Sequence, residues 1–259
     1  MESHILRIKR ELGIAVKTLL DDSVLKNDID FTFEFLLPFS KADRTDDVKL
    51  IIIGQDPTVR RAESRGDINL TLNLDKDNSL KTYLRKVCDI LEIDIEKEIY
   101  ATNLFKYFFR FPPADDQTIL TRQFKIWIDL LINEIAVFGN PFVITLGEPL
   151  IAQLIHTNSK KVKYYWNYIG DTKSGRDFKC NEPFENYLQR RIYPIAHQPT
   201  WNRNEFYKNY LVDYLNFIKQ NENLCPNYIP HWPACITRCT NTSSMTMQRF
   251  AFRATCRLK

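Results

Sequence analysis

Three polar side chains of different chemistry stand at the ends of predicted buried strands: Asp56, Asn103 and His197. The carboxyl ends of parallel strands share one edge of a sheet, where α/β proteins bind ligands and place catalytic groups. We therefore expect these side chains to converge. An acid, an amide and an imidazole that meet there can serve as a general base, a reader of hydrogen bonds and a stabiliser of a leaving group.

Glycines mark the turns at this edge of the sheet. The chain has only seven glycines, fewer than the usual ~7% of residues, yet Gly54, Gly66 and Gly147 fall beside the predicted turns. The β-branched run that stops at Gly54 is typical of a buried strand entering a tight turn. That turn, Gly54-Gln55-Asp56-Pro57, presents an acid on a backbone stiffened by proline.

Apolar periodicity predicts strands that alternate with helices. This alternation predicts an α/β fold, a three-layer α/β/α sandwich with a central, mostly parallel four-stranded sheet. Asn204 could cap the last helix. The predicted strands cover residues 48–53, 99–102, 142–146 and 192–196, and the predicted helices cover about 3–20, 79–91, 116–138, 148–155 and a segment after 204.

Composition favours one large domain followed by a tail. The 259 residues are 44% hydrophobic and 13% aromatic, enough to bury a substantial core. We expect a single domain over residues 1–220 and a loosely ordered tail over 221–259, where apolar periodicity ends and proline, serine and threonine become frequent. The chain has neither the apolar core of a signal peptide nor a membrane-length apolar run, which predicts a cytoplasmic protein without a membrane partner.

Six cysteines occur without the spacing of a disulfide framework or a zinc knuckle, so we expect reduced thiols. The tail residues that could in principle bind zinc lack a paired C-x-x-C motif, and we predict no metal site and no cofactor. These tail residues are Cys225, Cys235, Cys239, Cys256 and His231.

The net charge of +4 belongs to the tail, where five basic residues and one acidic residue follow position 220. Residues 1–220 are neutral, with 31 basic and 31 acidic residues. A nucleic acid would therefore have to meet local basic loops, although such residues are more often solvated surface charge. The loops contain Arg60, Arg61 and Arg65; Lys160, Lys161, Lys163, Lys173, Arg176 and Lys179; and Arg190, Arg191 and Arg203.

Taken in order, the motifs resemble those of the uracil-DNA glycosylase superfamily. The first is Gly54-Gln55-Asp56-Pro57, Asn103 and a strand ending at Gly147 follow, and the last is His197-Gln198-Pro199-Thr200-Trp201. They are most similar to the branch whose first motif is GQDPYH and whose last is HPSPL, over about residues 45–215. The resemblance implies a monofunctional DNA glycosylase. This DNA repair enzyme would flip uracil or a related damaged base out of the stack and hydrolyse its N-glycosidic bond.

The resemblance also implies roles for individual residues. Asp56 would position or activate the attacking water and offset positive charge on the deoxyribose. His197 would donate a hydrogen bond to the uracil oxygen that gains negative charge. Asn103 would read O4 and N3–H of uracil with its donor and acceptor. The backbone around Gln55 would complete the base pocket, with Thr58 and Asn69 as further base-binding residues.

On the DNA side, the resemblance assigns Trp201 to the apolar wedge that fills the space left by the flipped nucleotide. Arg203 could hold a phosphate, and Pro57, Pro199 and Thr200 would complete the DNA-binding surface. The implied partner is single- or double-stranded DNA, bound by a monomer.

Departures from the family motifs concern the base pocket. Thr58 stands where the family has the tyrosine that excludes thymine, and Val59 replaces the following histidine. The aromatic floor under uracil should fall near Asn69, yet residues 67–72 contain no aromatic side chain. Gln198 and Pro199 replace the proline and serine of HPS. The cysteine arrangement of the iron–sulfur branches is absent, which predicts no cluster.

Each site residue also has a purely structural interpretation. Asp56 and Pro57 are common turn starters, Asn103 could cap a turn, and Trp201 could belong to the core. A divergent, non-catalytic member that binds a nucleic acid or a protein through the same face is therefore a second hypothesis, because fold does not fix function. Retention of Asp56, Asn103 and His197 favours the enzyme, whereas the missing aromatic floor favours the binding module.

Overall fold

A computed structural model describes residues 1–57, 59, 62–113, 118–156, 160–169, 172–173 and 177–223. These residues belong to one compact unit, Met1–Leu224. The predicted tail, 221–259, lies almost wholly outside the described residues, so its loose order and the role of its cysteines stay predictions. Among the described residues, no helix is long and apolar enough to cross a membrane.

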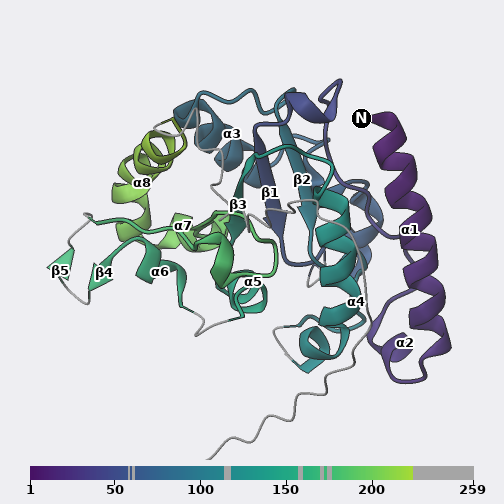
Figure 1. Ribbon diagram of the computed structural model, residues 1–259. Helices are drawn as coiled ribbons and strands as arrows, with labels where there is room; N and C mark the ends of the chain where they lie inside the picture. Colours follow the sequence, from purple (N-terminus) through teal and green to yellow (C-terminus); the bar gives the residue numbers. More distant parts are fainter. Residues whose placement is uncertain are drawn as a thin grey trace, which may run out of the picture. The chain divides into compact units, whose positions relative to one another are not determined.

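Four strands form one parallel sheet in the order β2-β1-β3-β6. Nearly every residue in them is buried, as expected for a parallel sheet covered on both faces. The predicted three-layer α/β/α sandwich is thereby confirmed (Figure 1). The strands are β1 (Leu50–Gly54), β2 (Ile99–Asn103), β3 (Phe142–Leu146) and β6 (Ile192–Ile195).

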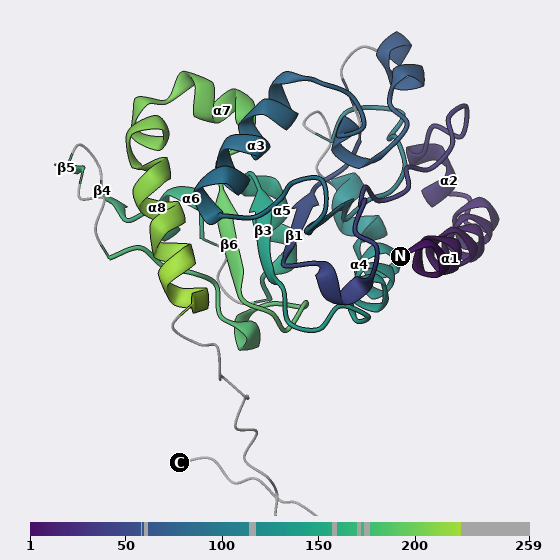
Figure 2. The same ribbon diagram turned by 90° about the horizontal axis from the view of Figure 1, so that it is seen from above.

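The helices pack in two groups, one in which α3 contacts α7 and α8 and one in which α1 contacts α2 and α4 (Figure 2). A short hairpin, β4 (Tyr168–Ile169) and β5 (Thr172–Lys173), was not predicted. The helices are α1 (Glu2–Asp21), α2 (Leu25–Asp28), α3 (Ser79–Leu91), α4 (Thr118–Ile135), α5 (Glu148–Leu154), α6 (Val162–Tyr165), α7 (Gln198–Arg203) and α8 (Glu205–Asn223), with short 3₁₀ turns at Thr45–Asp47, Ala62–Asp67, Thr71–Asn73 and Pro183–Glu185.

Caps set the limits of the helices that border the site. Asn78 accepts a hydrogen bond of 2.8 Å from the Lys81 amide at the start of α3, and Glu92 ends that helix in the left-handed region with φ 60°. The predicted cap of α8 is confirmed, because Asn204 Oδ1 accepts from the Phe206 amide at 3.0 Å. The predicted helix over 116–138 ends earlier than expected, at Ile135.

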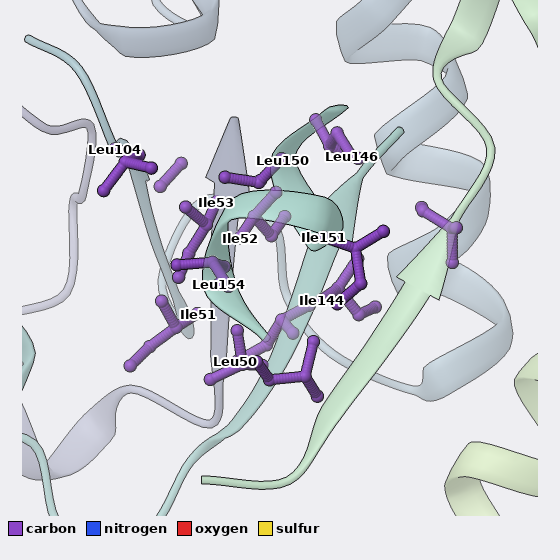
Figure 3. Packing of buried hydrophobic residues seen from close by; sticks show 14 of the residues in the cluster. Leu50, Ile51, Ile52, Ile53, Leu104, Ile144, Leu146, Leu150, Ile151 and Leu154 are labelled. Atoms are coloured by element: carbon purple, nitrogen blue, oxygen red, sulfur yellow. The ribbon is translucent and has the colours of Figure 1, made fainter. Parts of the chain in front are cut away.

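The core joins the central strands to the helices beside them. Figure 3 shows aliphatic side chains of β1 and β3 packed against those of α5. The labelled members are almost completely buried, so their apolar area contributes strongly to stability, at roughly 25 cal/mol per Å² removed from water. They are Leu50, Ile51, Ile52, Ile53, Leu104, Ile144, Leu146, Leu150, Ile151 and Leu154.

Some arginines of the basic loops hold the fold together. Arg65 is only 3% exposed and forms a 2.5 Å ion pair with Asp30, so it is not a solvated surface charge. Arg190 donates hydrogen bonds to backbone carbonyls at the end of α4 and in the turn that follows. Arg191 pairs with Glu222 of α8 at 3.2 Å. Sequence runs of positive charge did not reveal these buried and paired roles.

Candidate functional site

The pairing of β1 with β2 brings the first two motifs together. Gly54 is the register partner of Asn103. The pairing continues into the turns, where the Leu104 amide donates to the Gly54 carbonyl and the Phe105 amide donates to the Gln55 carbonyl, both at 2.9 Å. The turn that carries Asp56 therefore runs beside the turn that follows Asn103.

The Asn103 carboxamide is buried at this edge without a full set of hydrogen bonds. Asn103 is 1% exposed, and no atom of the described residues donates to its Oδ1. A buried acceptor left unsatisfied costs roughly 1–3 kcal/mol. Orphaned polar groups of this kind therefore need an explanation, and a ligand donor is one. The carboxamide is positioned to supply both an acceptor and a donor to a bound molecule.

Close approach at Gly54 determines where the carboxamide lies. A Cβ atom at Gly54 would lie 2.7 Å from Leu72 Cδ2 and closer still to Asn103 Oδ1. Both distances are shorter than real Cβ atoms show. The missing side chain of Gly54 therefore makes the space in which the amide and the leucine meet.

Leu72 forms an aliphatic surface next to this amide. Its backbone is in the left-handed region with φ 58°, and Asn73 follows with φ 52°. Such conformations are costly for residues other than glycine and concentrate at functional sites. The segment is tied down by Thr71, whose amide and hydroxyl both donate to the Leu37 carbonyl at 3.0 Å. A strained but anchored leucine thus lies beside the Asn103 amide.

Asp56 stands half-buried just beyond β1. Its Oδ1 accepts a hydrogen bond of 2.8 Å from Nε2 of the neighbouring Gln55, and the following Pro57 is buried. The glutamine side chain orients the carboxylate, and the proline fixes the backbone of the turn. An oriented carboxylate is suited to hold a water molecule or to face a positive charge.

His197 reaches the same edge from β6. The carbonyl of the preceding residue, Ala196, accepts from the buried Tyr83 hydroxyl at 3.1 Å. Gly147, with φ +88°, allows the β3 turn to approach so closely that its Cβ position lies 3.4 Å from His197 Cβ. His197 is exposed as a residue. Partial desolvation of its imidazole nevertheless lowers the pKa of the ring below its ordinary value. One strand separates β6 from β1, a spacing of about 10 Å.

The short helix α7 presents the last motif. Pro199, Thr200 and Arg203 are exposed on it. Trp201 is half-buried instead, with its ring centroid 5.0 Å from that of Tyr83 and the Lys86 ammonium 5.3 Å above the indole. Its indole Nε1 finds no acceptor among the described residues. The predicted wedge therefore rests against α3 in this structure.

The described structure places only one of the two remaining predicted base contacts. Thr58 lies outside the described residues. Asn69 is exposed, and its Nδ2 lies 3.5 Å from Asp75 Oδ2. Base binding by these two residues stays a prediction.

Sequence reasoning missed Leu72, Lys106 and Glu134. No sequence signal marks Leu72, because its position depends on an unusual backbone conformation. Lys106 had a signal, since it is a lone cation in the apolar run 104–109. Glu134 had one too, because it follows Leu131 by three residues on the apolar stripe of α4.

The assembled groups suit hydrolysis of a bound polar ligand: an oriented carboxylate, a buried amide and an imidazole around one edge. Within the described ranges, no three His, Cys, Asp or Glu side chains are grouped as metal ligands would be. The carboxylate, the amide and the imidazole supply acid–base and hydrogen-bonding chemistry.

Comparison with known families agrees with this arrangement. Residues 42–219 match the sequence profile of the Uracil DNA glycosylase superfamily. The match covers more than half of the chain and includes all four strands of the parallel sheet. No curated protein matches the chain significantly.

Replacing Gly54 tests the close approach at the strand end. We expect Gly54→Ala to lower the free energy of unfolding by about 1–3 kcal/mol, because the new methyl group overlaps Leu72 and the Asn103 amide. Urea denaturation measures this change. Gly13→Ala is the matched control, since nothing lies within 4 Å of its Cβ position in α1 and alanine favours a helix over glycine. Equal stability of the two variants would contradict the crowding.

The protonation of His197 can be followed by NMR. We expect its ring to titrate below the reference value of about 6.5 in the folded protein and near that value in urea. The unfolded state then binds more protons between the two pKa values, so this group favours folding above pH ~6.5 and loses that contribution as pH falls through the folded pKa. His197→Gln assigns the signal. A folded-state midpoint above 6.5 would show that burial does not control this ring.

Proposed function

Since the chain belongs to the uracil-DNA glycosylase superfamily, we propose that it is a monofunctional DNA N-glycosylase. Its substrate would be uracil, or a related damaged base, in DNA. The enzyme would flip the nucleotide out of the stack and hydrolyse the bond between the base and C1′ of the deoxyribose. No covalent enzyme intermediate is needed for this reaction.

The observation that carries the proposal is the buried Asn103 carboxamide, whose Oδ1 has no partner in the described part of the chain. Uracil offers N3–H as a donor and O4 as an acceptor, so one amide can satisfy both. The bound base would thereby remove the cost of the orphaned acceptor. Leu72 would contact one face of the base, in place of the aromatic floor that the family motif implies.

Asp56 would assist water attack at C1′. As the C1′–N1 bond breaks, its electron pair stays on the base and the sugar gains oxocarbenium character. A nearby carboxylate stabilises that positive charge and orients the water whose oxygen forms the new bond to C1′. The hydrogen bond from Gln55 keeps Asp56 in one orientation while the reaction proceeds.

His197 would stabilise the departing base. Because its pKa is lowered, the ring is neutral at pH 7 and can donate one N–H hydrogen bond to the uracil oxygen on which negative charge develops. Preorganised donors of this type commonly contribute about 10²–10³ in rate.

The exposed face of α7 would meet the DNA. Arg203 can reach a phosphate, and Pro199 and Thr200 lie on the same short helix. Trp201 would have to leave Tyr83 to enter the base stack as a wedge. Losing that aromatic contact would cost about 0.5–1.5 kcal/mol beyond the contribution of its buried area. This cost is small compared with that of unstacking a base pair, which is a few kcal/mol per step.

A second candidate function is a non-catalytic member of the fold that binds a nucleic acid or a protein. One observation favours it: the side chain beside the Asn103 amide is the aliphatic Leu72, which stacks on a base less well than an aromatic ring. The two candidates differ in whether a base is released.

Base release from a uracil-containing single-stranded oligonucleotide distinguishes them, with alkali-labile abasic sites as the readout. We expect the wild type to release uracil and Asp56→Asn to lose at least about 100-fold in rate, because the amide cannot offset the charge on the sugar.

Glu63→Gln is the matched control for Asp56→Asn, since Glu63 is an exposed acid a few residues further along the same loop. Full release by Asp56→Asn would remove the proposed role of Asp56. No release by the wild type from uracil, thymine mismatches, hypoxanthine or oxidised bases would favour the binding module.

A further inference from the structure

Lys106 and Glu134 form a fully buried ion pair that the proposed reaction does not use. Both side chains are 0% exposed, and Lys106 Nζ lies 2.6 Å from Glu134 Oε2. At this distance the ammonium and the carboxylate form a charge-assisted hydrogen bond within the ion pair. Burial lowers the pKa of Lys106, and the Glu134 carboxylate opposes that shift.

The pair is connected to the last residues of β2. Glu134 Oε1 accepts from the hydroxyls of Tyr100 and Thr102, both at 2.7 Å. Lys106 donates to the Thr102 hydroxyl and, at 2.6 Å, to the backbone carbonyl of Asn103. The charged cluster therefore ends on the residue whose carboxamide lines the pocket.

One peptide unit is held from both sides by these contacts. Its carbonyl, on Asn103, accepts from Lys106, and its N–H, on Leu104, donates to the Gly54 carbonyl at 2.9 Å. Fixing this peptide plane fixes the direction in which the Asn103 side chain leaves the backbone. The carboxamide rests against Gly54, the last residue of the neighbouring strand β1.

Stability alone does not account for such a pair. Taking two charges out of water costs several kcal/mol each, and apolar residues of similar size are often as stable or more so. In some proteins, buried charged groups specify one arrangement of the residues around them. Here the residue so arranged is Asn103.

We propose that Lys106 and Glu134 are positioning residues that hold the Asn103 carboxamide in the one orientation used to read a base. The effect on base selection rests on the proposed function. The positioning of the Asn103 side chain does not depend on it. Misplacing a recognition group by about 1 Å can cost on the order of 100-fold in rate.

The test removes both charges together, in Lys106→Met with Glu134→Leu, so that neither is left buried and unpaired. The primary readout is the side-chain amide signal of Asn103 in ¹⁵N-labelled protein without ligand, assigned by its loss in Asn103→Asp. We expect one sharp pair of resonances in the wild type and shifted, broadened or multiple resonances in the double variant. Uracil release by that variant should fall at least about tenfold.

The control is the ion pair between Lys81 of α3 and Glu96 of the loop before β2, in which Nζ lies 3.1 Å from Oε1. In the described part of the chain, neither residue forms a hydrogen bond or an ion pair with Gly54 or Asn103. Lys81→Met with Glu96→Leu should leave the Asn103 resonances unchanged. If the Lys106 double variant folds and shows wild-type Asn103 resonances, the pair is only structural and the inference is wrong.

If that double variant does not fold, Thr102→Val decides, because it removes the hydroxyl that links the two charges and keeps both of them. Altered Asn103 resonances support the inference, and unchanged ones overturn it. The wild type could release no base while the Asn103 resonances still depend on the ion pair. That result would overturn the proposed function but support the positioning role.

Discussion

The absence of a side chain at Gly54 is the constraint on which the site depends. Parallel pairing places Gly54 opposite Asn103, and only a residue without a Cβ leaves room there for the amide and Leu72 together. The backbone of β1 can then continue directly into the turn that carries Asp56. A buried strand that ends in glycine thus links the hydrophobic core of Figure 3 to the polar side chains of Asp56 and Asn103.

Two kinds of rigidity meet at this edge of the sheet. On the Asn103 side, buried charges and hydrogen bonds hold the end of β2 through Lys106 and Glu134. On the His197 side, the close approach of the Gly147 turn and one hydrogen bond, from the Tyr83 hydroxyl to the Ala196 carbonyl, hold the end of β6. The amide that reads a ligand is therefore fixed by polar contacts, whereas the imidazole stays exposed enough to meet one. This division suits a site that selects its ligand before it reacts.

The sequence was sufficient to predict the sheet and the helices around it, because short apolar runs and helical periodicity are local signals. The predicted helix 79–91 and strand 142–146 coincide with α3 and β3. The surroundings of the Asn103 amide were less predictable. Leu72 lies beside this amide in a left-handed backbone conformation that no sequence motif marks. Arg65 is buried because it pairs with Asp30, which is distant in sequence. Such outcomes depend on tertiary contacts, which local patterns do not contain.

The most direct test of the account asks whether the Asn103 amide binds the base through the N3–H group of uracil. Free uracil and 3-methyluracil, which lacks that donor, would be titrated into ¹⁵N-labelled protein while the Asn103 side-chain resonances are followed. The account predicts that uracil shifts these resonances and that the methylated base binds at least about tenfold more weakly, since the buried acceptor stays unpaired. Equal shifts and affinities for the two bases would contradict it.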